Sequence, residues 1–497
     1  MKVVMAAAEN DALPGGKVGG IGDVLRDIPP ALARQGAQVD VLIPGYGHFT
    51  RLPGAGRRGQ VQVRFRGQIE RVELFSVPPR QEVEGVRLLA LEHPGFSPWG
   101  EGRIYCNDGG DRPFATDANK FALFSVAVAQ ALADGLLGQP DVLHLHDWHA
   151  AMVAVLRAYH PGYAALRRVR TVYSIHNLAL QGVRPLSGDD SSLQSWFPEL
   201  RYDDAAVHDP HTWACFNPMR AAINLCDRVH AVSPTYAGEI LRPSDHRRGF
   251  FGGEGLDADL RRAQEEGRLL GILNGCEYPP EPAPAPEFAD LVAQAEREVL
   301  ALVGRAPQVD SAHLIALHRL AALRNAAGGL LLTSVGRITA QKVLILQQVM
   351  ADGRSALEHV LDCLREGEQF ILLGSGEASL EEFFTRIASL RGNFLFIRGY
   401  AEELSQSLYA SGDLFLMPSS FEPCGISQML AMRAGQPCLV HGVGGLADTV
   451  TDGVDGFVFH GASLAQQAQN MVVRLEQALA VKRGKPKAWN KVAQGAA

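Results

Sequence analysis

Gly15-Gly16-Lys17-Val18-Gly19-Gly20-Ile21-Gly22-Asp23-Val24 follows a short apolar run at residues 3–8 and opens a segment with helical patterning. An apolar run, a glycine-rich turn and a helix, in this order, are typical of the first unit of a parallel sheet that is covered by helices. The glycines let backbone N–H groups approach a phosphate, and the start of the helix adds a favourable dipole. The spacing matches neither a Walker A loop nor the usual G-x-G-x-x-G fingerprint, so the turn alone is equally compatible with a plain connector.

The same order of run, turn and helix recurs along the whole chain. Uninterrupted apolar runs, rather than alternating ones, indicate strands that are buried on both faces. The clearest runs cover residues 3–8, 39–43, 142–145, 171–175 and 229–232, then 330–335, 369–373, 394–397, 414–417 and 437–440. The sequence therefore predicts an α/β fold with doubly wound parallel sheets.

The two series of runs indicate two domains within the 497 residues. Gly271-Ile272-Leu273-Asn274-Gly275 is interpreted as the first strand of the second sheet. We therefore place the boundary near residue 268 and expect domains at 1–268 and 269–497. The proline-rich stretch 279–289 is expected to be extended, and the basic tail from Val481 onwards is expected to be solvated.

Composition narrows the class of protein. The formal charge is −7, which argues against a surface that binds nucleic acid over the whole protein. The seven cysteines are scattered and form no C-x-x-C pair, a pattern that fits a reducing compartment better than a disulfide scaffold. No stretch reaches the ~18–20 apolar residues that span a membrane. We therefore expect a cytoplasmic protein without a membrane partner.

Polar side chains follow two of the apolar runs, at the strand ends where α/β proteins bind ligands. His144-Leu145-His146-Asp147-Trp148-His149 ends one run, and His176-Asn177 ends the next. The three histidines of the first motif raise a zinc site as an alternative. However, strand alternation points His144 and His146 the same way while His149 already lies on the next helix, and no H-E-x-x-H pattern is present. We therefore favour a polar site wall and expect no metal. Asp257-Ala258-Asp259 is interpreted as an acidic helix start, not as a metal-binding D-x-D string.

Three motifs in the second half carry further candidate chemistry. Arg337 and Lys342 flank a strand-to-helix turn, where two cations could neutralise a diphosphate leaving group. Phe421-Glu422-Pro423-Cys424-Gly425 follows the run at 414–417, and its glutamate could accept hydrogen bonds from sugar hydroxyls. Gly444-Gly445 opens another glycine-rich helix start. Each motif alone is also compatible with an ordinary turn.

Taken together, the order of the motifs resembles the bacterial glycogen synthase and plant starch synthase family. The resemblance is carried by residues 17–24, 146–150, 175–177, 231–236, 271–275, 336–342, 421–425 and 444–450. It implies a GT-B fold, that is, two Rossmann-like domains with a cleft between them. It also implies transfer of glucose from a nucleotide diphosphate glucose, usually ADP-glucose, to the non-reducing end of an α-1,4-glucan such as glycogen. The configuration would be retained, with neither a metal nor a cofactor.

The resemblance further implies roles for single residues. His176 would contact the transferred glucose, Arg337 and Lys342 would hold the departing diphosphate, and Glu422 would bind the sugar hydroxyls and steady positive charge near the anomeric carbon. The implied substrate-binding residues are Lys17, Gly19 and Gly20 near the diphosphate and acceptor, Asp147, Asn177 and Asn274 in the sugar pocket, Tyr400 on the nucleotide base, and Ser427, Gly444 and Gly445 in a phosphate cradle. Glu9 is a further candidate for the sugar pocket. Because these groups divide between the domains, we expect the cleft to close when the donor binds.

Two departures from the family pattern and two rival functions stay open. Val343 stands where the family usually has glycine, and Cys276-Glu277 replaces the usual Ile-Asp. One rival is another retaining GT-B transferase that uses UDP-glucose or a small acceptor such as a sugar phosphate or sucrose. The other is a catalytically silent glucan-binding homologue. Since a binding protein needs no leaving-group cations, Arg337 and Lys342 argue against the second rival.

Overall fold

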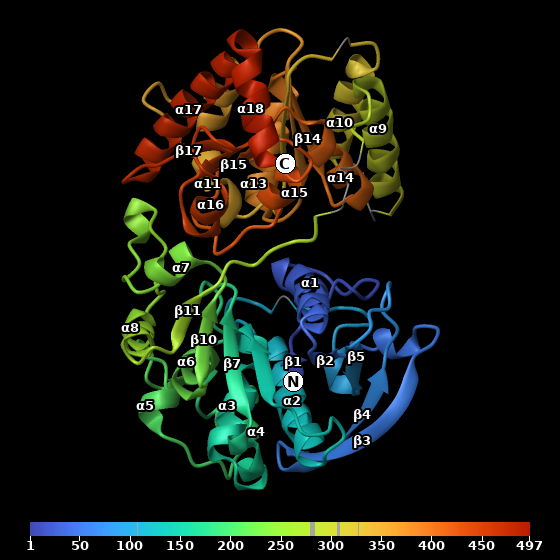
Figure 1. Cartoon of the computed structure of the whole chain (residues 1–497), viewed down its shortest axis with the longest axis vertical. Coiled ribbons are helices and arrows are strands. Elements are labelled where there is room, and N and C mark those ends of the chain that lie inside the picture. The colour runs from blue at the N-terminus through green and yellow to red at the C-terminus, as the bar shows by residue number, and fades with distance from the viewer. Residues whose placement is uncertain (107, 279–283, 306–308, 327) are drawn as a thin grey trace. The chain divides into compact units, whose positions relative to one another are not determined.

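The computed structural model describes residues 1–106, 108–278, 284–305, 309–326 and 328–497. Two compact units make up the chain. Unit 1 consists of Met1–Ser244 with Gly252–Gly275, and unit 2 consists of Asp245–Phe251 with Cys276–Ala497. Each unit is built on its own sheet, with helices packed against it (Figure 1). The prediction of an α/β fold with parallel sheets in two domains is confirmed.

In the described part of the chain, unit 1 carries a nine-stranded sheet in the order β11-β10-β7-β6-β1-β2-β5-β4-β3. The strands are β1 (Lys2–Ala6), β2 (Gln38–Pro44), β3 (Gly56–Phe65), β4 (Gln68–Ser76), β5 (Val86–Glu92), β6 (Val142–His146), β7 (Arg170–Ile175), β10 (Arg228–Ala231) and β11 (Leu269–Gly271). The strands from β11 to β5 run parallel, and the five runs predicted in the first half of the sequence all lie among them. A small separate sheet pairs β8 (Arg184–Pro185) with β9 (Cys215–Phe216).

The β3–β4 hairpin extends this sheet in antiparallel fashion, which the sequence analysis did not predict (Figure 1). Its two-residue turn consists of Arg66 and Gly67, with φ values of 53° and 73°. Positive φ at both turn residues gives the twist that matches two adjoining strands. Side chains of β3 alternate between buried and exposed after Gln60, a pattern typical of a sheet with one solvated face.

Helices cover the sheet of unit 1 and shape its loops. They are α1 (Gly20–Arg34), α2 (Ala115–Ala133), α3 (Asp147–Tyr159), α4 (Leu193–Trp196), α5 (Asp204–Val207), α6 (Pro218–Leu225), α7 (Pro234–Glu239) and α8 (Asp257–Glu265), with 3₁₀ turns at Phe49–Arg51, Pro94–Phe96 and Pro161–Arg168. Asp257 and Asp259 lie in the first turn of α8 and pair with Arg261 and Arg220, each at 2.8 Å. The interpretation of this acidic string as a helix start is confirmed.

Among its described residues, unit 2 carries a six-stranded, fully parallel sheet in the order β14-β13-β12-β15-β16-β17. The strands are β12 (Leu331–Val335), β13 (Gln369–Gly374), β14 (Phe394–Arg398), β15 (Leu414–Met417), β16 (Cys438–His441) and β17 (Gly456–Phe459), and the helices are α9 (Phe288–Arg305), α10 (Ser311–Leu323), α11 (Ala340–Gln347), α12 (Ala356–Asp362), α13 (Ala378–Leu390), α14 (Glu402–Ser411), α15 (Ser427–Met432), α16 (Gly444–Thr449), α17 (Leu464–Gly484) and α18 (Pro486–Ala496). Along β13, Phe370 and Leu372 join one apolar cluster while Ile371 and Leu373 join another. Both faces of this sheet are therefore covered, as predicted for doubly wound sheets.

The last strand of unit 1 corrects the sequence analysis. Residues 271–275 do not begin the second sheet, because β11 pairs in parallel with β10, placing Val229 opposite Leu269. A Cβ on Gly271 would lie 2.7 Å from Pro234 Cα, so this glycine lets the edge strand lie against α7. The chain passes into unit 2 after Gly275, and Asn274 therefore belongs to unit 1. The predicted boundary at 268 puts β11 on the wrong side.

Asp245–Phe251 leaves unit 1 between α7 and α8 and belongs to unit 2. Asp245 and Phe250 exchange both backbone hydrogen bonds, at 2.9 and 3.0 Å, around a 3₁₀ turn at His246–Arg248. The ring of Phe251 stacks on Phe421 with centroids 4.4 Å apart. Unit 2 is thus assembled from two separate stretches of the sequence.

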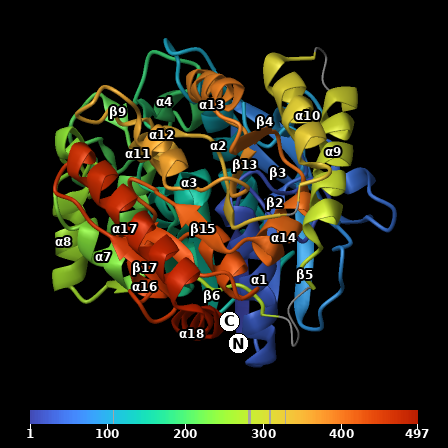
Figure 2. The same ribbon diagram turned by 90° about the horizontal axis from the view of Figure 1, so that it is seen from above.

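The C-terminal tail is helical, and most of its residues from Gly484 onwards are exposed, as expected for a solvated tail, but Trp489 is buried. In Figure 2, α17 and α18 lie side by side. Trp489 of α18 is only 4% exposed and stacks on Phe457 of β17 at 5.8 Å, while Lys482 lies over the same ring. One tryptophan therefore packs a basic segment against the sheet.

The proline-rich stretch is described only in part. Residues 279–283 lie outside the described residues, 284–287 form neither helix nor strand, and α9 begins at Phe288. Among the described residues, no helix combines the length and the apolar character that crossing a lipid bilayer requires.

Candidate functional site

His176 directly follows β7, beside the end of β6. His146 lies opposite Ser174 in the parallel register, and its Nδ1 is 2.9 Å from Nε2 of His176. The backbone N–H of His176 donates to Asp147 Oδ1 at 2.7 Å. Neighbouring residues thus hold both the ring and the backbone of His176.

Asp147 is buried and adopts φ 50°, which is unusual for a residue with a side chain. Burial raises the pKa of its carboxyl to about 8, against the opposing effect of hydrogen bonds from the His176 and Asn177 backbone. The predicted sugar-pocket residue therefore accepts hydrogen bonds from the turn that follows β7. In that same turn, Asn177 Oδ1 accepts from the N–H of Ala179 at 2.9 Å.

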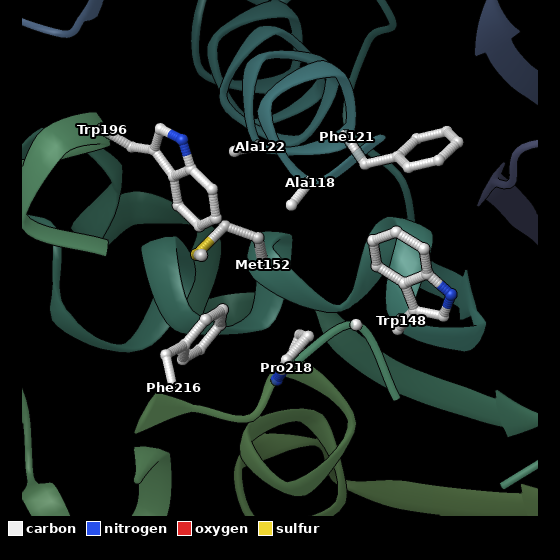
Figure 3. Close-up of a pocket in the computed structure, with 9 residues that line it drawn as sticks. Ala118, Phe121, Ala122, Trp148, Met152, Trp196, Phe216 and Pro218 are labelled. Atoms are coloured by element: carbon white, nitrogen blue, oxygen red, sulfur yellow. The ribbon is translucent and has the colours of Figure 1, made fainter. Parts of the chain in front are cut away.

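An apolar pocket lies behind this turn (Figure 3). Its wall is formed by Ala118, Phe121, Ala122, Trp148, Met152, Gly182, Trp196, Phe216 and Pro218, and it contains none of the predicted site residues. Gly182 has φ 67°, and a Cβ there would lie 2.2 Å from Trp148 Cε3. A glycine is therefore required where this loop crosses the ring of Trp148, the second residue of α3.

The glycine-rich turn before α1 is organised by Glu9. The backbone N–H groups of Val18 and Gly19 donate to Glu9 Oε2 at 2.7 and 2.6 Å, and Tyr105 Oη donates to Oε1 at 2.6 Å. Glu9 is 2% exposed. A carboxylate of the protein thus occupies the N–H of Gly19 that was expected to meet a diphosphate, while Gly20 is the first residue of α1.

Lys17, in the same turn, donates from Nζ to Asp23 Oδ1 at 2.6 Å and lies 3.9 Å from Asp11. Arg26 approaches Asp23 at 3.1 Å from the next turn of α1. The charge of Lys17 is therefore held toward α1 by carboxylates of its own unit.

In unit 2, Lys342 and Glu422 are brought into contact. Lys342 Nζ donates to Glu422 Oε2, across 80 residues of sequence, and Ser419 Oγ donates to the same oxygen at 3.0 Å. Glu422 is 5% exposed. Arg337 lies exposed in the turn after β12 and forms no ion pair with any residue in the described ranges. One predicted cation is thus paired with the predicted glutamate, and the other faces solvent.

Gly444 and Gly445 allow the Glu422 loop to approach closely. A Cβ on Gly444 would lie 1.9 Å from the Glu422 carbonyl oxygen, and one on Gly445 would lie 2.2 Å from that of Cys424. The N–H of Gly445 donates to the Glu422 oxygen at 3.0 Å. This packing role was not part of the prediction of a phosphate cradle. Ser427, the third member of that predicted cradle, is the first residue of α15.

The remaining predicted residues lie at other strand ends. Tyr400 follows β14 through Gly399 and is 61% exposed. Beneath it, Arg398 Nε contacts Glu381 at 2.7 Å and its guanidinium also pairs with Asp310. Asn274 is 5% exposed, and its N–H donates to the Val232 carbonyl oxygen at 3.1 Å.

The histidine-rich motif has the predicted geometry. The rings of His144 and His146 lie on the same side of β6 with centroids 4.1 Å apart, and His149 lies on α3. His144 Nε2 is 2.7 Å from Ser174 Oγ. Within the described ranges, no group of three or more histidine, cysteine, aspartate or glutamate side chains could hold a metal ion.

Several supporting residues were missed by the sequence analysis. Tyr105 and Ser419 hold the two carboxylates Glu9 and Glu422, and Gln428 Nε2 donates to the carbonyl oxygens of Cys424 and Gly425 at 3.2 and 3.0 Å. Gln428 lies beside Ser427 and could have been considered with it. Tyr105 carries no local signal, because only the fold brings it to Glu9.

Two family models match the chain. One, described as the starch synthase catalytic domain, matches residues 2–262, and the other, described as glycosyl transferases group 1, matches residues 329–477. A glycogen synthase of Streptococcus gordonii is 36% identical over 471 residues, which cover 90% of this chain and 85% of that protein. A glycogen synthase of Desulfitobacterium hafniense is 30% identical over 511 residues, covering 100% and 95%.

Solved structures give the same picture of the fold. The catalytic domain of starch synthase IV from Arabidopsis thaliana, bound to ADP and acarbose, matches with a TM-score of 0.74 and 26% identity, covering 100% of this chain and 94% of that one. A sucrose-phosphate synthase from Thermosynechococcus elongatus matches with a TM-score of 0.52 and 14% identity, so it shares the fold alone.

Proposed function

Because the chain belongs to the family of glycogen and starch synthases, and is therefore a glycosyltransferase with a GT-B fold, we propose that it transfers glucose from ADP-glucose to the non-reducing end of an α-1,4-glucan such as glycogen, with retention of the anomeric configuration. The glycogen synthases among its relatives support the glucan acceptor. The ADP bound to the related starch synthase supports the donor.

The contact between Lys342 and Glu422 is the observation that carries this proposal. The two residues come from separate motifs, one expected to serve the leaving group and the other the sugar. A cation beside the departing diphosphate and a carboxylate beside the sugar hydroxyls are the two kinds of group that this bond cleavage needs. An ammonium group has three N–H donors, so Lys342 can bind a phosphate oxygen while it keeps its contact with Glu422.

The proposed reaction breaks the bond between C1 of glucose and the diphosphate oxygen and forms a bond from C1 to the acceptor oxygen. The acceptor hydroxyl releases its proton to the solvent, and the negative charge moves onto ADP. Fixed cations stabilise that charge without reorganisation, a role assigned here to Arg337 and Lys342. The exposed guanidinium of Arg337 is suited to bind a phosphate through two N–H groups.

Unit 1 supplies the remaining groups in this proposal. His176 contacts the transferred glucose, and the Lys17–Gly20 turn, shaped by Glu9, contributes Lys17 and the start of α1. Asp147 contributes indirectly, because it holds the backbone of His176 in place.

The experiment measures incorporation of labelled glucose into glycogen and into a maltooligosaccharide, from ADP-glucose and UDP-glucose in parallel. The expected result is incorporation from ADP-glucose with the higher kcat/KM. A higher kcat/KM with UDP-glucose would overturn the donor assignment. Transfer to sucrose or a sugar phosphate without incorporation into glycogen would overturn the acceptor assignment, and no transfer from either donor would identify a silent homologue.

We also propose that the protein works in a reducing compartment, the cytoplasm. None of the seven cysteines, all of which lie within the described residues, forms a disulfide in the structure. Thiol titration of the denatured, unreduced protein is expected to count all of them, and a lower count would contradict this assignment.

A further inference from the structure

His176 lies at one end of a group of buried and partly buried polar side chains from three neighbouring strands. His146 contacts it from β6, and the ring of His144 lies 4.1 Å from that of His146, tilted by 30°. From His144, a second chain of hydrogen bonds runs to Ser174 of β7 at 2.7 Å and from there to His230 of β10 at 2.8 Å. The predicted catalytic histidine therefore lies beside a hydrogen-bonded network that extends over three strands.

Burial favours the neutral form of each of these rings. Burial lowers the pKa of His144 to about 3, and burial together with the neighbouring imidazoles lowers the pKa values of His146 and His176 far below the usual range. Burial also lowers the pKa of His230. A neutral imidazole has one N–H, so each ring donates from one nitrogen and accepts at the other.

The direction of the second chain is fixed by a carbonyl group. His230 Nε2 lies 3.0 Å from the Ile272 carbonyl oxygen, which can only accept, so His230 carries its hydrogen on Nε2. Its Nδ1 then accepts from the Ser174 hydroxyl, whose oxygen accepts from Nε2 of His144. This chain is complete in itself and supplies nothing to His146.

The contact between His146 and His176 has its own direction. His146 Nε2 is buried and has no hydrogen-bond partner among the described residues. A buried N–H without a partner is rarer in proteins than an acceptor without one. His146 therefore carries its hydrogen on Nδ1 and donates it to Nε2 of His176, which leaves the hydrogen of His176 on Nδ1.

We propose that His146 is a positioning residue that fixes the tautomer of His176, so that this half-buried ring presents an Nδ1–H donor to an oxygen atom of the transferred glucose. The inference rests on the proposed function for the role of His176 in binding the sugar. It adds the chemical character of that contact: His176 donates a hydrogen bond to the sugar and does not act as a base toward it.

The direct test is nitrogen NMR of the full-length protein with ¹⁵N-labelled histidine. Protonated and unprotonated ring nitrogens have well-separated chemical shifts, and the signals of His176 are assigned by their loss in His176→Gln. The expected result for the wild-type protein is a protonated Nδ1 and an unprotonated Nε2 in His176. The opposite assignment would overturn the inference, and this measurement needs no variant of His146.

Variants of His146 test the positioning role. His146→Asn keeps an N–H donor near the place of Nδ1, His146→Phe removes it, and His146→Asp offers only an acceptor and so favours the other tautomer of His176. We expect His146→Asn to keep most of the activity, whereas the other two lower kcat about 10- to 100-fold, as is usual when a partner that orients a functional group is lost. The expected change in KM for the donor is less than about threefold.

His144→Phe is the matched control, because His144 lies on the same strand and beside His146, but its Nε2 bonds to Ser174 and not to His176. It is expected to leave kcat and the tautomer of His176 unchanged. Equal kcat values for His146→Asn, His146→Phe and the wild-type protein would overturn the positioning role. Full activity of His176→Gln would instead overturn the proposed function of His176 in the sugar contact, while the NMR spectrum would still report its tautomer.

Discussion

Replacing Glu9 by alanine is expected to destabilise unit 1 and to weaken donor binding together. The carboxylate accepts hydrogen bonds from two backbone N–H groups and one tyrosine hydroxyl. Hydrogen bonds to a charged group contribute about 1.5–3 kcal/mol each. Val18 is 49% exposed, so water can reach the loop and replace part of the loss there, whereas the Tyr105 hydroxyl is left without an acceptor. We therefore expect Glu9→Ala to lower the free energy of unfolding of unit 1 by about 3–5 kcal/mol.

Thermal unfolding measures the first part of this prediction. A loss of that size lowers the unfolding transition of unit 1 by roughly 10 °C. Glu9→Gln keeps an oxygen for the two N–H groups and places an amide beside Tyr105, so it should shift the transition by only a few degrees. Tyr105→Phe, which removes one of the three bonds, is the matched control and should fall between the wild-type protein and Glu9→Ala.

Kinetics measure the second part. In Glu9→Ala the turn at residues 17–20 loses its anchor, so KM for ADP-glucose should rise more than kcat falls, and proteases should cleave the turn faster. The reasoning would be refuted by a Glu9→Ala protein with the thermal transition and KM of the wild type. A lower transition with an unchanged KM would show that Glu9 stabilises the fold without shaping the donor site.

Four further predictions follow from the same structure. Arg337→Ala and Lys342→Ala should each lower kcat about 10²-fold, because a fixed charge beside a departing oxyanion contributes ~3 kcal/mol to its stabilisation. Lys487→Ala, at an exposed lysine, is the control, and an unchanged kcat in both test variants would contradict their roles. Gly445→Ala should lower both the thermal transition and kcat, since its methyl group would meet the backbone of the Glu422 loop; a fully active, equally stable variant would contradict the packing argument. The pKa of the Asp147 carboxyl rises from 3.8 to about 8 on folding, so between these pH values the native state holds a proton that the unfolded state releases. The free energy of unfolding should therefore fall by about 1.4 kcal/mol for each pH unit between about pH 4 and 8. Urea unfolding of Asp147→Asn, which keeps a residue type that tolerates positive φ, should lack this slope. Activity with ADP-glucose should survive EDTA, and inactivation that added divalent metal reverses would speak against leaving-group stabilisation by side chains alone.

Most parallel strands of both sheets could be predicted because burial on both faces favours uninterrupted apolar runs, as in residues 369–373 and 414–417, whereas β5 and β17 were not among the predicted runs. The β3–β4 hairpin escaped prediction because its strands alternate and because Arg66-Gly67 is not a common turn pair. The edge strand β11 was assigned to the wrong sheet, since a run of three residues says nothing about its partner. In the basic tail, the polar residues indicated exposure, but Trp489 is buried and packs the helix onto the sheet.

For the candidate site, motif order located the strand ends but not the contacts made there. Lys342 and Glu422 were both named from the sequence, yet their pairing depends on the parallel order of β12 and β15. Glu9 and His146 contact partners distant in sequence, so no local spacing marks those contacts, whereas Ser419 lies only three residues before the glutamate that it supports. Gly444 and Gly445 were assigned to a ligand, because a sequence cannot distinguish glycines that meet a phosphate from glycines that meet the chain itself.

The ribosome synthesises Phe251 long before Phe421, the ring on which it stacks. At the usual rate of chain elongation, Phe421 is synthesised roughly 10–30 s after the segment Asp245–Phe251. Unit 1 can complete its last strand in that time, whereas the small hairpin at Asp245–Phe251 must wait for the residues of unit 2 with which it is grouped. Because the hairpin precedes Cys276 in the sequence, a fragment that begins at Cys276 would lack it. The loop that carries Glu422 would then lose the aromatic cover of its neighbour Phe421, so no single cut releases unit 2 intact.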